Sequence, residues 1–423
     1  MFEKLLSGQP SGIFGIGYDD PTTVGIICTI ILLIMVVSGV RVVFAASIAG
    51  IIGLVELIGV GPALGNIGAI PYSKSVTFVL GLLPIFILIG FLAYQAGMTR
   101  QLYEAAKAWI GFVPGGLAVA TVFATAGFAA VSGASTATAA VFSRVAIPEM
   151  LKEGYDKKLA AGVVAAGGTL ASLIPPSAIL IIYAIIVEES VGALLLAGFL
   201  PGIFSAIVYG GIIIIWAKMN PDLGPPGRRY SFNEKMKALP GIIPIAIVIT
   251  VIISAIYAGW ATPTEAGALG AFVVLIIAIM RGLKLQALNF ALIETAKLVA
   301  MIFSIIWGVL IFVRFLGFSG LPETFANWII SLPFDPYTVL ILILLGYVIL
   351  GMFIDAIGLL LLTLPVVYPA IILLNGGPDV TADQSPFGMT FNQVSVWFGI
   401  IVVKMAEVCL ITPPIGLNCF VVA

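Results

Sequence analysis

The sequence Leu173-Ile174-Pro175-Pro176 recurs in altered form as Leu410-Ile411-Thr412-Pro413-Pro414, and each copy lies inside a long apolar segment. Two adjacent prolines remove two backbone donors and crowd the preceding turn, so a helix must break at each copy. Broken backbone at membrane depth is tolerated only where it faces protein or a water-filled cavity. A matched pair of proline-interrupted segments in two halves of a chain is typical of the binding site of a secondary transporter.

The composition predicts an all-α polytopic membrane protein. The 423 residues are 61% hydrophobic and only 9% charged, with a mean hydropathy of +1.20. So few polar residues could not cover a soluble domain, whereas lipid requires no polar cover. The apolar runs are continuous over about 20 residues, which excludes the shorter alternating segments of a transmembrane barrel. The N-terminus lacks the pattern of a cleaved signal peptide, so we expect the apolar run near 24–40 to remain as a span.

Several kinds of chemistry have no support in the sequence. The chain contains no histidine, which removes the commonest metal ligand and general base. Cys28, Cys409 and Cys419 lie in apolar segments without paired spacing, so we expect small buried side chains and neither disulfides nor zinc ligands. A glycine-rich phosphate loop with a following Lys-Ser/Thr is also absent. We therefore expect no enzyme and no cofactor other than a coupling ion.

The distribution of Lys and Arg predicts a re-entrant hairpin in the first half of the chain. An apolar segment at about 110–142 lies between two basic clusters, and a single crossing would put these clusters on opposite faces of the membrane. A segment that enters and returns keeps both in the cytoplasm. Its tip is expected near Ser132-Gly133-Ala134-Ser135-Thr136, since small polar side chains suit a loop buried in protein.

The same reasoning predicts two halves of opposite orientation. The segment at about 337–374 is too long for one span and has acidic flanks, so we expect a second hairpin that enters from outside with its tip near Asp355. Such an inverted repeat produces alternating access around a midplane site. The predicted boundaries are a first half at 1–220 with a broken helix at about 159–187, a cytoplasmic linker at 221–238, and a second half at 239–423 with a broken helix at about 396–423.

Five motifs follow one another along almost the whole chain: Ser132-Gly-Ala-Ser-Thr136, Gly168-Thr-Leu-Ala-Ser-Leu-Ile-Pro-Pro-Ser177, Thr262-Pro-Thr-Glu-Ala-Gly267, Gly351-Met-Phe-Ile-Asp355 and Thr412-Pro-Pro-Ile-Gly416. By these motifs the chain resembles the large membrane subunit of tripartite ATP-independent periplasmic (TRAP) transporters, the DctM-like family. The resemblance implies a fold similar to that of sodium-coupled divalent-anion symporters, in which a mobile transport domain moves as an elevator. It also implies sodium-driven import of organic anions, such as C4-dicarboxylates or sialic acids, across a bacterial inner membrane.

The resemblance implies two protein partners. One is a small four-helix membrane subunit (DctQ-like), and the other is a soluble periplasmic protein (DctP-like) that delivers the substrate. Members of the family usually continue beyond the apolar run in which this sequence stops at Ala423. We therefore expect either a truncated sequence or a shortened member.

Candidate ion ligands follow from the same resemblance, because sodium takes oxygen ligands and a broken helix frees backbone carbonyls. One ion is expected between the first hairpin tip and the first break, and a second between the second hairpin and the second break. The hydroxyls could instead only satisfy backbone groups, and Asp355 could instead cap a helix. The matching positions are Ser132, Ser135, Thr136, Gly168 and Thr169 for the first ion, and Gly351, Asp355, Cys409 and Thr412 for the second.

The substrate carboxylate is expected at helix N-termini that follow the two breaks. Ser177 and Asn418 are the polar residues placed there. Glu265 is instead expected to form a capping box with Thr262. Two alternatives to the three-part importer remain, namely a stand-alone sodium/dicarboxylate symporter without a binding protein and a channel. Two hairpins of opposite orientation argue against the channel, since they suit a site that opens to one side at a time.

Overall fold

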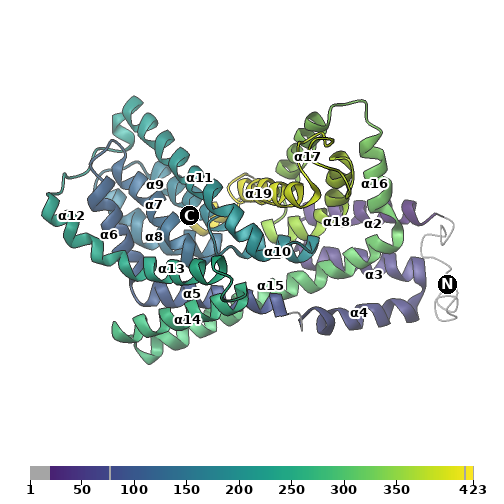
Figure 1. Cartoon of the computed structure of the whole chain (residues 1–423), viewed down its shortest axis with the longest axis horizontal. Coiled ribbons are helices and arrows are strands. Elements are labelled where there is room, and N and C mark those ends of the chain that lie inside the picture. The colour runs from purple at the N-terminus through teal and green to yellow at the C-terminus, as the bar shows by residue number, and fades with distance from the viewer. Residues whose placement is uncertain (1–19, 76–77, 414–415, 423) are drawn as a thin grey trace. The chain divides into compact units, whose positions relative to one another are not determined.

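A computed structural model of the chain describes residues 20–75, 78–413 and 416–422, and its regular elements in these ranges are all helices (Figure 1). Five of the helices are long and apolar enough to cross a membrane, or up to seven spans if each of two bent pairs counts as one. The prediction of a multi-pass helical membrane protein is therefore confirmed. The five are α11 (Val191–Met219), α14 (Pro263–Met280), α15 (Leu285–Ser319), α18 (Ala356–Leu374) and α19 (Phe391–Cys409).

The two bent pairs change direction at short breaks. Helix α5 (Leu82–Gln95) meets α6 (Met98–Ile110) at 68°, and the segment Phe232–Gly241, which contains α12 (Phe232–Ala238), meets α13 (Ile243–Tyr257) at 49°. Gly97, at a φ of +71°, makes the first of these turns possible without the steric cost that a Cβ would bring. The linker expected at 221–238 thus contains a short helix, which begins with a capping box between Ser231 and Glu234.

Contacts divide the chain into two compact units, each assembled from segments that are distant in the sequence. Unit 1 contains 1–80, 182–189 and 300–409, and unit 2 contains 81–181, 190–299 and 410–423. Helices α10 (Ala178–Val187) and α15 each contribute residues to both units. These two units differ from the two halves predicted at 1–220 and 239–423. The opposite orientation of the two halves stays a prediction.

Unit 2 is built around α7 (Gly116–Ser132), which is buried on nearly all sides. Its sequence is rich in glycine and alanine, and small side chains let neighbouring helices approach closely. Helix α7 packs against α5, α6, α11 and its two successors in the chain, α8 (Ser135–Lys152) and α9 (Lys157–Gly168). The first hairpin therefore forms the centre of this unit.

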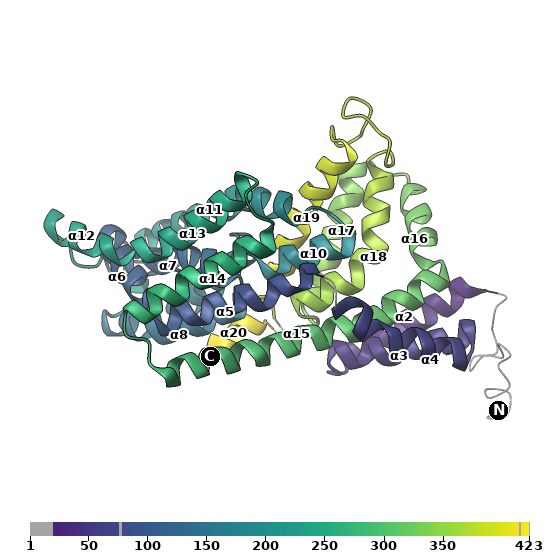
Figure 2. The same ribbon diagram turned by 60° about the horizontal axis from the view of Figure 1, so that its bottom comes forward.

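Unit 1 combines N-terminal helices with the second hairpin. Its elements are α2 (Pro21–Val37), α3 (Val42–Ile58), α4 (Val60–Ser75), part of α15, α16 (Leu321–Ile330), α17 (Pro336–Gly351), α18 and α19. Helices α17, α18 and α19 pack on one another and lie side by side in Figure 2. Gly53 of α3 allows the ring of Phe315 in α15 to pack closely against α3, since a Cβ on Gly53 would lie 2.2 Å from that ring.

Local predictions can be compared with these helices directly. The apolar run near 24–40 forms α2, and the expected capping box is present, with the Glu265 carboxylate accepting from Thr262 N at 2.8 Å and Thr262 Oγ1 accepting from Glu265 N at 3.4 Å. All three cysteines are free, as predicted. Cys28 and Cys409 are buried, but the expectation of burial is wrong for Cys419, which is exposed on the short helix α20 (Leu417–Val422).

Candidate functional site

The tip of the first hairpin lies between α7 and α8. Helix α7 ends at Ser132, and Gly133 adopts a left-handed conformation with φ +61° while its N–H donates to Ala129 O at 3.1 Å. Glycine is the residue that takes this conformation most readily, so it closes the helix and reverses the chain. Helix α8 begins two residues later, at Ser135.

The first break separates α9 from α10. Helix α9 ends at Gly168, a single 3-10 turn follows as η3 (Thr169–Ser172), and α10 starts after the two prolines. Ser177 is completely buried and caps α10, since Leu180 N donates to its Oγ at 3.2 Å and Oγ itself donates to Ser172 O. The break therefore interrupts the α-helical hydrogen bonds between α9 and α10, and hydroxyl groups bond some of its carbonyls, such as Thr169 O and Ser172 O.

The hairpin tip and the first break are in direct contact. Ala178 N, at the start of α10, donates to Gly133 O at 3.1 Å. A Cβ on Gly133 would lie 2.4 Å from Pro176 O, so only glycine fits between the two segments. On the other side of the break, a Cβ on Gly168 would lie 3.0 Å from Ser135 O. Two predicted site segments, residues 132–136 and 168–177, thus meet.

Hydroxyl groups gather where these segments meet. Ser132 Oγ and Thr138 Oγ1 share a hydrogen bond at 2.8 Å, and both residues are buried. Thr169 Oγ1 donates to Ala166 O at 2.7 Å and lies 3.4 Å from the Tyr209 hydroxyl of α11. Ser135 is buried and Thr136 is half-buried. We call Ser132, Ser135, Thr138, Gly168 and Thr169 the first-break cluster.

Thr138 and Tyr209 were not among the residues that the sequence predicted. Thr138 follows the tip motif by two residues and is fully buried, but its link to Ser132 exists only because the chain reverses at Gly133. Its spacing of three from Ser135 on a helix was the available signal, since residues three apart share a face. Tyr209 lies in a separate helix, and no spacing in the sequence connects it to the break.

Asn418, which was predicted to line the substrate site after the second break, contacts the first half of the chain. Its N–H donates to Leu410 O at 2.9 Å, and its side-chain Nδ2 donates to Ala165 O of α9 at 3.2 Å. Helix α20, which carries Asn418, packs on α8 and α9 within unit 2. Asn418 is completely buried, and its Oδ1 accepts no hydrogen bond from the residues that the structure describes.

At the second hairpin, α17–α18, two of the four predicted ligands, Gly351 and Cys409, are in contact. Asp355 caps α18, with its Oδ2 accepting from Gly358 N at 3.0 Å, so the capping alternative is present in the structure. Gly351 ends α17 directly against Cys409, since a Cβ there would lie 1.8 Å from the sulfur. The Cys409 thiol lies 3.3 Å from Tyr347 O and 3.1 Å from Met405 O. Thr412 belongs to unit 2, and Pro414 lies outside the described residues.

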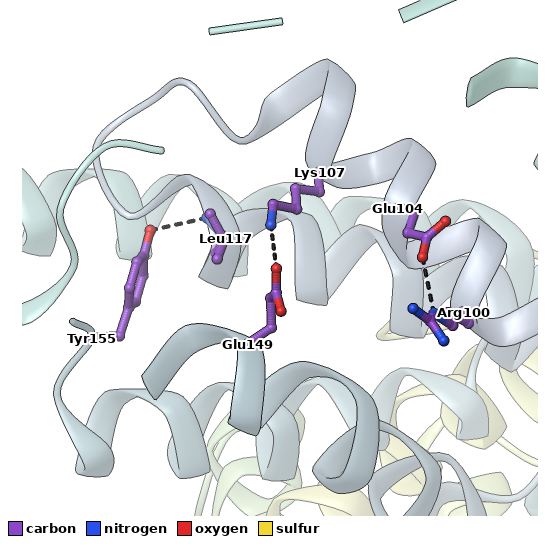
Figure 3. Close-up of polar contacts among 6 residues, drawn as sticks. All are labelled: Arg100, Glu104, Lys107, Leu117, Glu149 and Tyr155. Carbon is purple, nitrogen blue, oxygen red and sulfur yellow. Dashed lines mark hydrogen bonds and ion pairs between the residues drawn. The ribbon is translucent and has the colours of Figure 1, made fainter. Parts of the chain in front are cut away.

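The base of the first hairpin is held by polar contacts (Figure 3). Lys107 of α6 forms an ion pair with Glu149 of α8, and both side chains are largely shielded, with 16% and 35% of their surfaces exposed. Tyr155, just after α8, accepts from Leu117 N at 3.0 Å and donates to Pro225 O at 2.8 Å. Burial raises the pKa of Tyr155 to about 12, so its hydroxyl keeps the proton that it donates.

Two helical hairpins, two proline-interrupted helices and several apolar spans define a multi-pass membrane protein of the kind that moves solutes across a bilayer. Residues 24–423 match the family model described as "Tripartite ATP-independent periplasmic transporter, DctM component". The chain therefore belongs to the DctM family of TRAP transporter large permease subunits.

Relatives in the curated proteins are named for different substrates. The chain is 33% identical to the C4-dicarboxylate TRAP transporter large permease protein DctM of Pseudomonas aeruginosa, over 83% of this chain and 78% of that protein. It is 29% identical to the sialic acid permease SiaM of Vibrio cholerae, over 82% and 77% of the two chains. It is 27% identical to the 2,3-diketo-L-gulonate permease YiaN of Escherichia coli, over 80% and 76%.

A comparison with solved structures finds the YdaH transporter of Alcanivorax borkumensis, whose crystal structure is described as revealing an unusual topology. The TM-score is 0.49 at 14% sequence identity, over 86% of this chain and 87% of that chain.

Proposed function

We propose that this chain is the large membrane subunit of a sodium-driven importer of small organic anions in the bacterial inner membrane. A small DctQ-like membrane subunit and a DctP-like periplasmic binding protein complete the transporter, and the binding protein delivers the substrate. The three relatives above are named for C4-dicarboxylates, sialic acid and 2,3-diketo-L-gulonate. Each of these compounds is a carboxylate. The proposed substrate class is accordingly a small carboxylate.

The observation that carries the proposal is the contact between the hairpin tip and the first break. The hydrogen bond from Ala178 N to Gly133 O joins them, and the first-break cluster surrounds this junction with hydroxyl and carbonyl oxygens. A sodium ion needs a set of oxygens at close range in a site that excludes lipid.

The second ion is assigned to Asp355, Gly351, Cys409 and Thr412 by analogy with the first. In both halves a hairpin precedes a proline-interrupted helix, namely α7–α8 before α9 and α10, and α17–α18 before α19 and α20. Two such sets of opposite orientation are typical of alternating-access transporters, and we infer that the transport domain of this chain moves as an elevator. Ser177, which caps α10, and Asn418, in the first turn of α20, remain the proposed contacts to the substrate carboxylate.

Uptake into proteoliposomes tests this function. The full chain, co-purified with its small subunit, is reconstituted and supplied with dicarboxylates or sialic acid bound to the cognate periplasmic protein. We expect uptake with an inward sodium gradient and little uptake when choline replaces sodium. Uptake driven by a proton gradient alone would contradict the ion assignment, and uptake that needs no binding protein would favour a stand-alone symporter.

Two substitutions extend this test to the proposed ligands. Ser135→Ala and Thr412→Ala each remove a hydroxyl near a break, so we expect each to raise the sodium concentration that gives half-maximal uptake. Membrane insertion, measured by expression and gel filtration, should be unchanged because neither change adds polarity. Unchanged sodium dependence in both variants would count against the proposed ligands.

A further inference from the structure

A charged cavity of about 660 Å³ lies in unit 2, away from the first-break cluster. Helix α6, the second arm of the first hairpin (α8) and the segment 230–238 form its walls. Four basic and three acidic side chains line the cavity. Two tyrosines also line it, the buried Tyr103 and the half-buried Tyr230. The charged residues are Arg100, Lys107, Arg144, Lys237, Glu104, Glu149 and Glu234.

Each lining carboxylate already has a basic partner. Glu104 pairs with Arg100 at 3.0 Å, and Glu149 pairs with Lys107 (Figure 3). Glu234 pairs with Arg228 at 2.8 Å and also accepts from Ser231 N. Within the part of the chain that the structure describes, the acids of this cavity are therefore neutralised.

Two lining cations remain without such a partner. The side chains of Arg144 and Lys237 form no ion pair or hydrogen bond with any described residue, and both are exposed. They come from two different elements that line the cavity, α8 and the segment 230–238. A cavity lined by two cations without an acidic partner attracts an anion such as a phosphate group.

The neighbouring residues place this cavity at the boundary between lipid and water. Trp109 and Phe112 are 38% and 41% exposed at the end of α6, and Lys235 lies over their rings at 5.8 and 5.0 Å. Trp109 Nε1 also donates to Lys235 O at 3.2 Å. Exposed aromatic rings beside lysine are typical of the membrane interface, and the density of Lys and Arg around 100–158 and 218–237 indicates the cytoplasmic leaflet.

We propose that this cavity binds the phosphate headgroup of an anionic phospholipid from the cytoplasmic leaflet. Arg144 and Lys237 contact the phosphate, and the acyl chains leave past the exposed rings of Trp109 and Phe112. Basic pockets between membrane helices on the cytoplasmic side recognise such headgroups, whereas a free phosphate would gain nothing from the adjacent aromatic surface. The bound lipid bridges the hairpin arm α8 and the segment 230–238.

Native mass spectrometry of the purified transporter complex tests the proposal. The complex is extracted from nanodiscs of phosphatidylcholine with or without phosphatidylglycerol, and the retained lipid is counted. The variant Arg144→Gln/Lys237→Gln removes both open cations. A matched control, Lys218→Gln/Lys284→Gln, makes the same change of charge at exposed lysines that do not line the cavity.

We expect the wild type and the control to retain phosphatidylglycerol equally, and Arg144→Gln/Lys237→Gln to retain at least about tenfold less, because both cations that contact the phosphate are removed. Arg144→Lys/Lys237→Arg should restore retention. Gel filtration and thermal unfolding of the same samples show whether each variant is folded.

Three results would overturn the proposal. Equal retention by wild type and Arg144→Gln/Lys237→Gln would show that the two cations bind no lipid. Displacement of phosphatidylglycerol by inorganic phosphate, or protection of the protein by phosphate in pure phosphatidylcholine, would assign the cavity to a soluble anion. Loss of the small membrane subunit from Arg144→Gln/Lys237→Gln with lipid retention unchanged would assign it to a protein contact.

Discussion

At the scale of single residues, glycines decide how closely the hairpin tips approach their partners. Gly133 lies very near Pro176 O, and Gly351 lies very near Cys409, so a residue with a Cβ fits neither position. The sequence motifs predicted both neighbourhoods, because a tip motif and a proline pair occur together in each half. Thr138 was missed although its spacing of three from Ser135 puts the two on one helix face, since its contact with Ser132 depends on the reversal at Gly133.

Gly133→Ala should separate the first hairpin tip from the break. The new Cβ would lie 2.4 Å from Pro176 O at a φ of +61°, a conformation that costs a non-glycine residue about 1 kcal/mol even without the clash. We expect a lower thermal unfolding temperature and weaker protection by sodium in detergent. Gly162→Ala is the control, because a Cβ on this α9 residue meets nothing within 4 Å. Equal sodium protection in both variants would contradict the proposed junction.

Gly351→Ala should destabilise unit 1 by forcing a Cβ to within 1.8 Å of the Cys409 sulfur. Overpacking of this kind costs about 1–3 kcal/mol. Cys409→Gly in the same chain removes both clashing atoms and should restore part of the stability, whereas Gly346→Ala in the same helix should have little effect, since its Cβ meets nothing within 4 Å. Thermal unfolding measures all three. A Gly351→Ala protein as stable as Gly346→Ala would show that Cys409 is not packed there.

At the scale of elements, proline and charge predicted the breaks better than the ends of helices. The hairpin arm expected to stop near residue 142 continues as α8 to Lys152, because the added turns bury Ala146 and Met150 and α8 packs on α7 and α9. Helix α15 likewise begins at Leu285, well before its apolar centre. Apolar runs mark the lipid-facing length of a helix, whereas contacts with neighbours decide where it ends.

Asp355, at the start of α18, has two proposed roles, helix capping and sodium binding, and substitutions can separate them. Asparagine caps a helix about as well as aspartate but carries no charge, whereas alanine does neither. We expect Asp355→Asn to keep the thermal stability and to raise the sodium concentration for half-maximal uptake severalfold. Asp355→Ala should in addition lose about 1 kcal/mol of stability. If Asp355→Asn matched the wild type in sodium dependence, capping would be the whole role of this residue.

The ion pair between Lys107 and Glu149 ties helix α6 to the hairpin arm α8 (Figure 3). Because the Lys107 side chain is only 16% exposed, Lys107→Ala should cost more stability than a surface substitution, about 1–2 kcal/mol. A double-mutant cycle with Glu149→Ala in thermal unfolding should show a coupling between the two changes. The exposed pair Arg100–Glu104, at 78% and 57% exposure, is the control and should show little coupling. Equal coupling in both cycles would contradict the shielding of the first pair.

At the scale of the whole molecule, composition was sufficient to predict a multi-pass helical protein, and the motifs were sufficient to predict its family. The assembly of each compact unit from distant segments was beyond the sequence. Asn418 was expected to line the substrate site after the second break, and nothing in the sequence indicated that its side chain bonds Ala165 O of α9, where α20 packs on α8 and α9. Such contacts depend on how helices pack in three dimensions, and the spacing of apolar residues in the sequence does not predict that packing.

We propose that the oxygens between the first hairpin tip and the first break bind the coupling sodium. Thr138→Val removes one buried hydroxyl from the first-break cluster with little change in shape. Thr125→Val is the matched control, since Thr125 is equally buried in α7 and its hydroxyl donates only to Val122 O, at 2.8 Å.

The most direct measurement is a sodium titration of substrate uptake into proteoliposomes for the wild type and these two variants. We predict that Thr138→Val raises the half-maximal sodium concentration about tenfold, which corresponds to about 1.4 kcal/mol of lost ion binding, while Thr125→Val leaves it unchanged. A Thr138→Val transporter with the sodium dependence of the wild type would contradict the claim.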